Sequence, residues 1–200
     1  MLWLALYFPD LPLQVFMDNK SIGKPIVVTH KKNNYEIILS CNKNAMDIGI
    51  YPGLRLYAAF AICSDLTIYE RNLNLEKKFL ENIAHWAYQF SSQISFDSSV
   101  LLLEIGASLN LFGGHHLLLK KIKKEFKNFN LKLKWSIGPT PMASSLLARN
   151  KPGFKVTQKK LIENLETIPI SELTNDYQTQ KLINNIGLYS IGDCLRLPRA

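Results

Sequence analysis

Residues 75–105 read LEKKFLENIAHWAYQFSSQISFDSSVLLLEI, and this stretch decides the fold. Its first half has apolar side chains three and four residues apart, which predicts an amphipathic helix over 75–90. Its second half contains the apolar run 100–103, which predicts a strand buried on both faces within 94–105. A helix that leads directly into a buried strand favours helices packed on a sheet.

The same kinds of element continue on both sides of this stretch. Residues 2–8 form an apolar run that Pro9 ends, which is typical of a buried first strand. Downstream, the spacing of apolar residues predicts a helix over 116–129, a half-buried strand over 131–137, and helices over 141–149, 158–165 and within 180–197. The order of strand, insert, helix, strand, helix, strand, helix predicts an α+β fold built on a palm-like, ferredoxin-like βαβ layer.

The insert covers residues 20–74 and reads as a small domain of its own. Its pattern predicts strands over 24–29, 35–40 and 66–69, and helices over 42–48 and 56–63. The predicted domains are therefore residues 1–19 with 75–166 as the main layer, 20–74 as the insert, and 167–200 as a helical tail. Because residues 197–200 follow closely on a predicted helix, we expect the chain to be the front part of a longer protein.

Composition sets broad limits on partners and compartment. Of 200 residues, 47% are hydrophobic and 20% charged, and the net charge of +8 favours anionic partners such as nucleic acid or acidic lipid. A lysine-rich compositional bias is the alternative. Cys41, Cys63 and Cys194 match no zinc or redox spacing, so we expect buried thiols in a reducing compartment. No apolar run approaches about 18 residues, so a cytoplasmic protein without a membrane span is expected.

Three segments, in order, resemble the Y-family (DinB/UmuC-type) translesion DNA polymerases. They read SCNKNAMDIGIYPGLRL at 40–56, VLLLEI at 100–105, and SIGPTP through ARNKPG at 136–153. They are similar to the fingers segment, the palm strand and the helix that carries the two palm lysines in that family. The resemblance implies a palm from residues 1–19 and 75–166, a fingers domain from 20–74, and a truncated helix-hairpin-helix thumb from 167–200.

The residues at the family's catalytic positions depart from its pattern. Nucleotidyl transfer uses two divalent ions about 3.5–4 Å apart, and magnesium requires oxygen ligands, chiefly carboxylates. When the strands are aligned, the family's carboxylate positions fall at Ala5, Tyr7, Ser99 and Val100. The resemblance therefore implies vacated catalytic positions, with no catalytic residue, no metal and no cofactor. Magnesium is expected only if the chain is an active polymerase.

Other nucleotide-contacting positions differ as well. The family's triphosphate-gripping Tyr and Arg fall at Lys43 and Met46, and its two palm lysines fall at Pro141 and Ser145. The remaining nearby carboxylates could form a rearranged metal site, which is the main alternative: they are Asp10, Asp97 and Glu104. For Glu104, hydrogen bonding to backbone donors at a strand end is the preferred interpretation. The tandem pair His115–His116 is interpreted as a helix start rather than a metal site.

The stretches LWLAL at 2–6 and LEIGASLNLFGG at 103–114 are similar to the ImuB-type group of catalytically inactive Y-family members. That resemblance implies a non-catalytic adaptor in DNA repair, the SOS response and mutagenic translesion synthesis, cytoplasmic and associated with the nucleoid. The implied partners are damaged DNA, an error-prone replicative-type DNA polymerase, a RecA-like protein and a sliding clamp. The alternatives are an active error-prone translesion polymerase and a truncated, non-functional fragment of one.

Predicted nucleic-acid contacts lie in the C-terminal part of the chain. Residues 183–193 resemble a thumb hairpin whose backbone N–H groups meet phosphates, and Lys151 belongs to the family-like ARNKPG segment. The predicted contacts are Gly187, Ser190, Gly192 and Lys151. A purely structural turn is the alternative for the hairpin, and Asp176 in the preceding turn would repel phosphate. The lysines between 120 and 134 are interpreted as a solvated face rather than a DNA-tracking surface.

Overall fold

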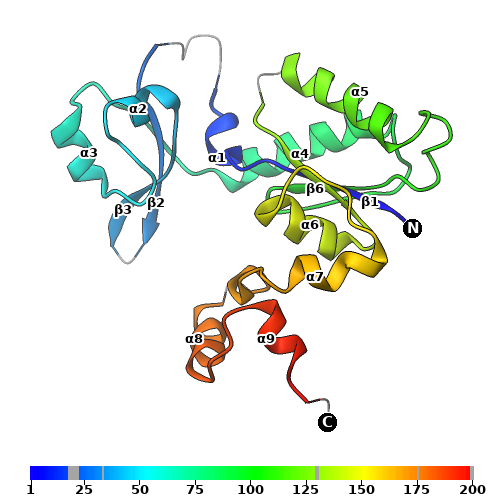
Figure 1. The fold of residues 1–200 in the computed structure, drawn as a ribbon. Coiled ribbons are helices and arrows are strands. Elements are labelled where there is room, and N and C mark those ends of the chain that lie inside the picture. Colours follow the sequence, from blue (N-terminus) through cyan, green and yellow to red (C-terminus); the bar gives the residue numbers. More distant parts are fainter. Residues whose placement is uncertain (18–22, 33, 129–130, 175, 199–200) are drawn as a thin grey trace. The chain divides into compact units, whose positions relative to one another are not determined.

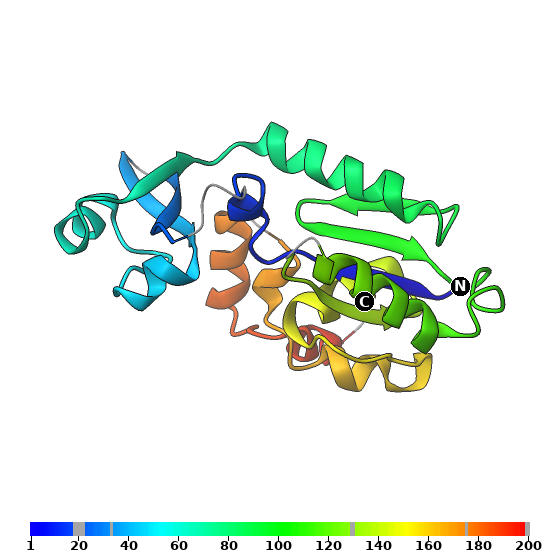
Figure 2. The same ribbon diagram turned by 90° about the horizontal axis from the view of Figure 1, so that it is seen from above.

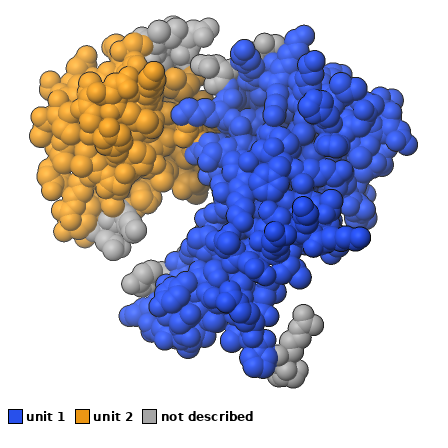
Figure 3. Space-filling model, viewed as in Figure 1, with its two compact units in different colours: residues 1–9, 84–200 blue, residues 10–83 orange. Residues whose placement is uncertain are grey.

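The computed structural model describes residues 1–17, 23–32, 34–128, 131–174 and 176–198. The chain divides into two compact units, residues 1–9 with 84–200 (unit 1) and residues 10–83 (unit 2), coloured separately in Figure 3. Unit 2 is wider than the predicted insert of 20–74, and the predicted tail belongs to unit 1. The finer division into palm, fingers and thumb stays a prediction.

Unit 1 is built on a four-stranded sheet of order β5-β6-β1-β7. Its strands are β1 (Trp3–Tyr7), β5 (Ile94–Asp97), β6 (Val100–Glu104) and β7 (Lys134–Gly138). The central strand β1 pairs antiparallel with both β6 and β7. Residues 94–105 were expected to hold one strand, but they form a β5–β6 hairpin, since Asp97 and Val100 pair across a turn in which Ser98 has φ of 53°.

Helices cover both faces of this sheet, as Figures 1 and 2 show. On one face lie α5 (His115–Asn128) and the end of α4 (Leu73–Ala87), of which only residues 84–87 belong to unit 1. Trp86 of α4 and Phe126 of α5 meet edge to face, with ring centroids 4.9 Å apart. Phe8 reaches the same ring at 5.7 Å. These aromatic contacts confirm the amphipathic helix that the sequence predicted around Trp86.

The other face of the sheet is covered by α6 (Pro141–Asn150). Ser144 fixes the helix, because its hydroxyl lies 3.0 Å from the carbonyl oxygen of Trp3 in β1 and 2.8 Å from that of Thr140. Ser136 of β7 donates to the Ser144 carbonyl at 2.6 Å. Gly138 allows this approach, since a Cβ there would lie 2.8 Å from the Ser144 hydroxyl oxygen.

The C-terminal part of unit 1 packs onto α6. It comprises η2 (Gln158–Lys160), α7 (Leu161–Leu165), η3 (Ile170–Glu172), α8 (Tyr177–Asn185) and α9 (Ile191–Leu195). A buried cluster joins it to α6: Leu146, Leu147, Val156, Ile168 and Ile191. This shared core explains why residues 167–198 do not separate into a unit of their own.

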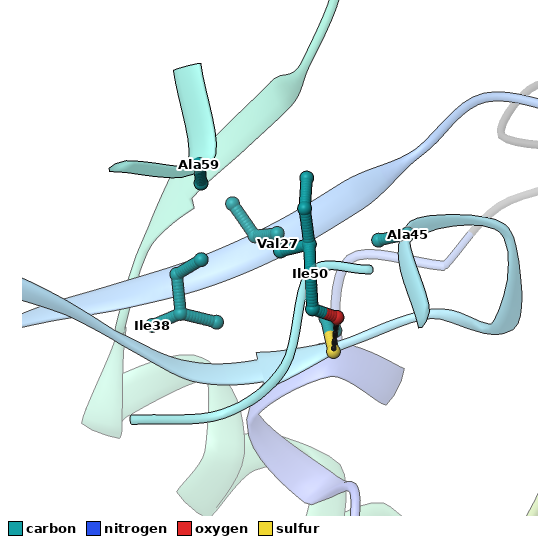
Figure 4. Close-up of a cluster of buried hydrophobic side chains, with 6 residues drawn as sticks. Val27, Ile38, Ala45, Ile50 and Ala59 are labelled. Carbon is teal, nitrogen blue, oxygen red and sulfur yellow. Dashed lines mark hydrogen bonds between the residues drawn. The ribbon is translucent and has the colours of Figure 1, made fainter. Parts of the chain in front are cut away.

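Unit 2 holds a three-stranded sheet of order β3-β2-β4. Its elements are α1 (Leu11–Gln14), β2 (Ile26–Lys32), β3 (Tyr35–Cys41), α2 (Lys43–Asp47), α3 (Leu56–Ile62) and β4 (Thr67–Glu70). Figure 4 shows its core, in which side chains from β2, β3, α2, α3 and the loop after α2 meet: Val27, Ile38, Ala45, Ile50 and Ala59. Asn42 caps α2 by accepting the N–H of Ala45 at 3.0 Å.

Two predictions about the chain as a whole can be compared with the structure. Cys41 is buried and its thiol donates to the Ile50 carbonyl at 3.4 Å, but Cys63 and Cys194 are only half-buried, so the expectation of three buried thiols was wrong for two of them. Within the described residues, no helix has both the length and the apolar character needed to cross a membrane.

Candidate active site

The predicted catalytic positions meet on one face of unit 1. Tyr7 of β1 pairs with Val100 of β6, and Ala5 pairs with Leu102. Because side chains two residues apart on a strand share a face, these four form one surface. Ala148 of α6 completes it, and Ala5 and Val100 are 0% and 1% exposed. Three of the four predicted positions therefore line one apolar floor.

Ser99, the fourth predicted position, lies in the turn just before β6. Its carbonyl oxygen accepts the backbone N–H of Phe8 at 2.9 Å, which ties the hairpin to the end of β1. Tyr7, Ser99 and Val100 therefore lie close together at the end of β1 and the start of β6, and Ala5 lies two residues before Tyr7 on the same face. None of them carries a carboxylate.

A pocket of about 240 Å³ opens beside this floor. Strand β6 contributes Val100 and Leu102, helix α6 contributes Ser145 and Arg149, and Asp97 and Glu172 stand at the β5 end and in η3. We call it the vacated pocket. Ser145 occupies one of the positions at which the resemblance expected a palm lysine, so this position contributes a hydroxyl instead of a charge.

Arg149 is the residue of this pocket that sequence reasoning missed. Its guanidinium carbon lies 5.8 Å from the centre of the Tyr7 ring, within the range of a cation–π contact. Its Nε is buried and has no hydrogen-bond partner in the described part of the chain. The available signal was its spacing, since Arg149 follows Ser145 by one helical turn and must share its face.

The residues of the floor do not fit the magnesium ions that polymerase chemistry requires. Magnesium binds hard oxygen ligands, and the floor offers a methyl group, an isopropyl group and a neutral phenol where carboxylates would stand. The positive charge of Arg149 lines the same pocket and repels a divalent cation. Among the described residues, no three His, Cys, Asp or Glu side chains lie close enough to hold a metal together.

The alternative of a rearranged site required Asp10, Asp97 and Glu104 to converge. Asp97 lines the vacated pocket and pairs with Val100, the first residue of β6. Glu104 lies four residues beyond Val100 on that strand, about 13 Å away at roughly 3.3 Å per residue. Asp10 belongs to unit 2, where it precedes α1 as the N-cap residue. Within unit 1, Asp97 and Glu104 therefore stand apart and do not share a site.

Glu104 has the structural role that its position suggested. Its carboxylate accepts backbone N–H groups from Leu2 at 2.9 Å, Gly106 at 3.0 Å and Ala107 at 3.4 Å. Burial raises the pKa of Glu104, but these hydrogen bonds to the charged form lower it by more, so its pKa lies below the ordinary value. The carboxylate ties the N-terminal residues to the loop after β6.

His115 and His116 begin α5, as expected. Burial, followed by the positive charges of Lys155 and His116, lowers the pKa of His115. The two imidazoles line a different pocket from the vacated one.

The predicted nucleic-acid contacts of the hairpin are engaged within the protein. Ser190 and Asp193 form a capping box at the start of α9, in which the Asp193 carboxylate accepts the Ser190 N–H at 2.8 Å. The N–H of Gly192 donates to the Glu166 carbonyl at 3.0 Å, and that of Gly187 to the Asn184 carbonyl at 3.0 Å. Binding of DNA by this hairpin stays a prediction, and the structural turn is the interpretation that these bonds favour.

Lys151 and Asp176 complete this comparison. The ammonium of Lys151 donates to the carbonyl of Asn164 at 2.9 Å, so it stabilises the end of α7. Asp176 caps α8 by accepting the N–H of Thr179 at 2.9 Å, and the hydroxyl and amide of Thr179 lower its pKa. A carboxylate at this helix start repels phosphate, as the sequence indicated.

The fold is that of the Y-family DNA polymerases. The crystal structure of DinB from Sulfolobus solfataricus matches with a TM-score of 0.69 at 18% identity over 99% of this chain and 61% of that one. A ternary complex of Dbh polymerase matches with a TM-score of 0.70 at 19% identity over 99% and 60%. The match extends through the sheet, the insert and the C-terminal helices.

The chain belongs to the impB/mucB/samB family, whose model matches residues 13–149. Protein ImuB of Caulobacter vibrioides is 24% identical over 76% of this chain and 34% of its own length. The DNA repair protein rev1 of Schizosaccharomyces pombe is 25% identical over 88% and 20%. DNA polymerase IV of Glaesserella parasuis is 23% identical over 89% and 52%, so the chain spans about half or less of these relatives.

Proposed function

We propose that this chain belongs to a non-catalytic, Y-family polymerase-like adaptor in DNA repair and mutagenic translesion synthesis. The apolar floor of Ala5, Tyr7, Val100 and Leu102 is the observation that carries the proposal, because the resemblance predicts catalytic carboxylates at three of these positions, Ala5, Tyr7 and Val100. The relatives named Protein ImuB and DNA polymerase IV support the setting of DNA repair.

The fold can persist without the reaction, because the residues that form its core are not the residues that would bind metal. Phosphoryl transfer needs metal ions that activate the attacking oxygen and neutralise the developing charge, and alkyl side chains do neither. The sheet, α6 and the C-terminal helices share continuous cores, so a platform for other molecules persists without metal ligands. Such a platform acts by holding partners together.

The partners proposed for the intact protein follow the ImuB-type resemblance. They are damaged DNA, an error-prone replicative-type DNA polymerase, a RecA-like protein and a sliding clamp, acting in the SOS response at the nucleoid of the cytoplasm. An adaptor of this kind would place the catalytic polymerase at a lesion while contributing no chemistry of its own.

An active translesion polymerase is the second candidate, and one observation favours it. Asp97 and Glu172 both line the vacated pocket, so two carboxylates remain near the position of the lost site. Against it stands Arg149, which lines the same pocket and neutralises part of their charge.

Primer extension by the intact protein separates the two candidates. We expect no incorporation on a labelled primer–template with either Mg²⁺ or Mn²⁺, under conditions in which a DNA polymerase IV extends the same primer. Template-dependent incorporation that Asp97→Asn abolishes would instead establish the active polymerase. The adaptor itself is tested by pull-down of a RecA-like protein and an error-prone replicative-type polymerase; failure to capture either would contradict it.

A further inference from the structure

The lysines of α5 do not form one uniform solvated face. Lys121 lies over the rings of Phe90 and Phe112, at 5.5 and 5.6 Å from their centres, so it covers part of the core. Lys120 and Lys123 instead line a hollow of about 430 Å³ at the edge strand β7. Lys120 and Lys123 therefore differ from Lys121, because they line the same hollow.

The hollow gathers positive charge from three separate segments. Besides the two lysines, it is lined by His115 and His116 from the start of α5, Trp135 from β7, and Lys155 from the segment after α6. We call it the β7-edge pocket. No acidic side chain lines it, and none of its three lysines forms an ion pair within the described residues. The lowered pKa of His115, to which Lys155 contributes, is consistent with the positive field there.

Two of these lysines are held in place by the fold. Lys155 lies on a segment that pairs with β7, since the N–H of Val156 donates to the Ile137 carbonyl at 2.7 Å and that of Gly153 to the Trp135 carbonyl at 2.8 Å. The ammonium of Lys123 lies 4.6 Å from the centre of the Trp135 ring. The fold therefore holds positively charged lysines around one hollow. Their mutual repulsion destabilises this arrangement, and a bound anion would offset that repulsion.

The first turn of α5 adds to this field. The helix has 14 residues and begins at His115, and the N–H groups of a first turn carry a partial positive charge. The lysines and the residues of this helix end line the same hollow, so both add positive potential there.

We propose that the β7-edge pocket binds the phosphate backbone of DNA, as a contact surface separate from the vacated pocket. Lysine ammonium groups suit phosphate oxygens as point charges, without the planar geometry that a carboxylate or base edge rewards. Lys123 already covers one face of the Trp135 ring, which leaves less of that ring for a base to stack on. We therefore expect the contact to be with the phosphate backbone and independent of base sequence. The choice of DNA over an acidic peptide rests on the proposed function.

The test measures DNA binding as a function of salt. A labelled 20-base-pair duplex is titrated with the chain, followed by fluorescence anisotropy, and compared with the triple variant Lys120→Gln/Lys123→Gln/Lys155→Gln. Each lost phosphate contact lowers the slope of log K against log salt by about 0.9, so the triple variant should lower it by about 3. At low salt we expect the affinity to fall by at least tenfold.

A second triple variant controls for net charge. Three exposed lysines outside the pocket are changed in the same way: Lys78→Gln, Lys124→Gln and Lys127→Gln. All six lysines are exposed, so both variants should change the unfolding midpoint little. Equal loss of affinity in the two triples would show a general charge effect and overturn the proposal. Changing the three pocket lysines to arginine should restore the slope.

The remaining outcomes separate this inference from the proposed function. If the wild-type chain binds DNA and the pocket triple variant binds it equally well, the proposal for the β7-edge pocket is wrong, while the proposed adaptor function is not contradicted. No binding of DNA by the wild-type chain would contradict both the pocket and the DNA-directed function. Displacement of DNA by a polyglutamate peptide at equal charge concentration would overturn the assignment of DNA as the occupant.

Discussion

The vacated pocket and the β7-edge pocket belong to the same unit and adjoin strands of the same sheet, yet they differ in chemistry. The first has an apolar floor of Ala5 and Val100, two carboxylates and one arginine at its rim. The second has three lysines, two histidines and no acid in its lining. In the proposed adaptor the first pocket provides no carboxylate ligands on its floor, while the second, elsewhere on the same unit, is lined by positive charge.

This difference teaches that metal ligation and attraction of a nucleic-acid backbone depend on different features of one fold. Metal ligation depends on a few carboxylates at fixed positions, so a few substitutions remove it. Backbone attraction depends on summed charge, which many positions can supply. A protein with a net charge of +8 can therefore lose the first property and keep the second.

Restoring a carboxylate to the floor should give the largest effect on stability. Val100 is 1% exposed, so Val100→Glu places a charge among alkyl groups and should lower the free energy of unfolding by about 3 kcal/mol. Urea denaturation measures this. The control Val100→Thr, similar in shape but uncharged, should cost about 1 to 2 kcal/mol. A glutamate variant as stable as wild type would show that the floor still accommodates metal ligands.

Glu104 should give the next effect, with a defined pH dependence. Glu104→Gln weakens three hydrogen bonds to backbone N–H groups and should cost about 2 kcal/mol at neutral pH. Because the folded pKa lies below the unfolded value, this contribution is present above that value, near 4.5, and is lost as the pH falls through the folded pKa. Stability measured from pH 7 to pH 3 should therefore converge for the two proteins. Parallel curves would contradict the assignment.

Ser190 tests whether the hairpin is structural. Ser190→Ala removes the hydroxyl that caps α9 and should cost about 1 kcal/mol, while the affinity for duplex DNA should change by less than twofold. Ser190→Thr keeps the capping oxygen and serves as the control. A tenfold loss of DNA affinity at unchanged stability would instead place the phosphate contact in the hairpin.

Arg149 should give the smallest effect and sharpens the contrast between the pockets. Arg149→Met removes a cation–π contact, so the free energy of unfolding should change by about 1 kcal/mol or less. Duplex affinity should stay within twofold of wild type, in contrast to the pocket triple. If Arg149→Met weakens DNA binding tenfold, the vacated pocket, rather than the β7 edge, binds phosphate.

The fold followed from local patterns wherever periodicity was strong. The helix around Trp86 and the strands around Leu6 and Ile137 lie close to their predicted positions, because burial of one face fixes apolar spacing. The β5–β6 hairpin was missed, because its turn residue with a positive φ of 53° is Ser98 and not the glycine that usually marks such a turn in a sequence. Helix α1 was missed because it has only four residues.

The site was predictable to the extent that it lies on adjacent strands. Aligning Ala5 and Val100 with the family's pattern was enough to find the apolar floor, because strand register brings them together. Arg149 and Lys155 were not found, because their roles depend on how α6 and the segment after it return to the sheet. Such returns are tertiary features that single-sequence spacing does not encode.

Titration of the chain with Mn²⁺, followed by electron paramagnetic resonance in the presence of primer–template and a deoxynucleoside triphosphate, tests the central claim most directly. The nucleotide alone gives the background of bound Mn²⁺. We predict no binding above that background, because an alkyl floor and a resident arginine provide no ligand set. If the wild-type chain binds one or two further equivalents of Mn²⁺ and the Asp97→Asn variant does not, the account is contradicted.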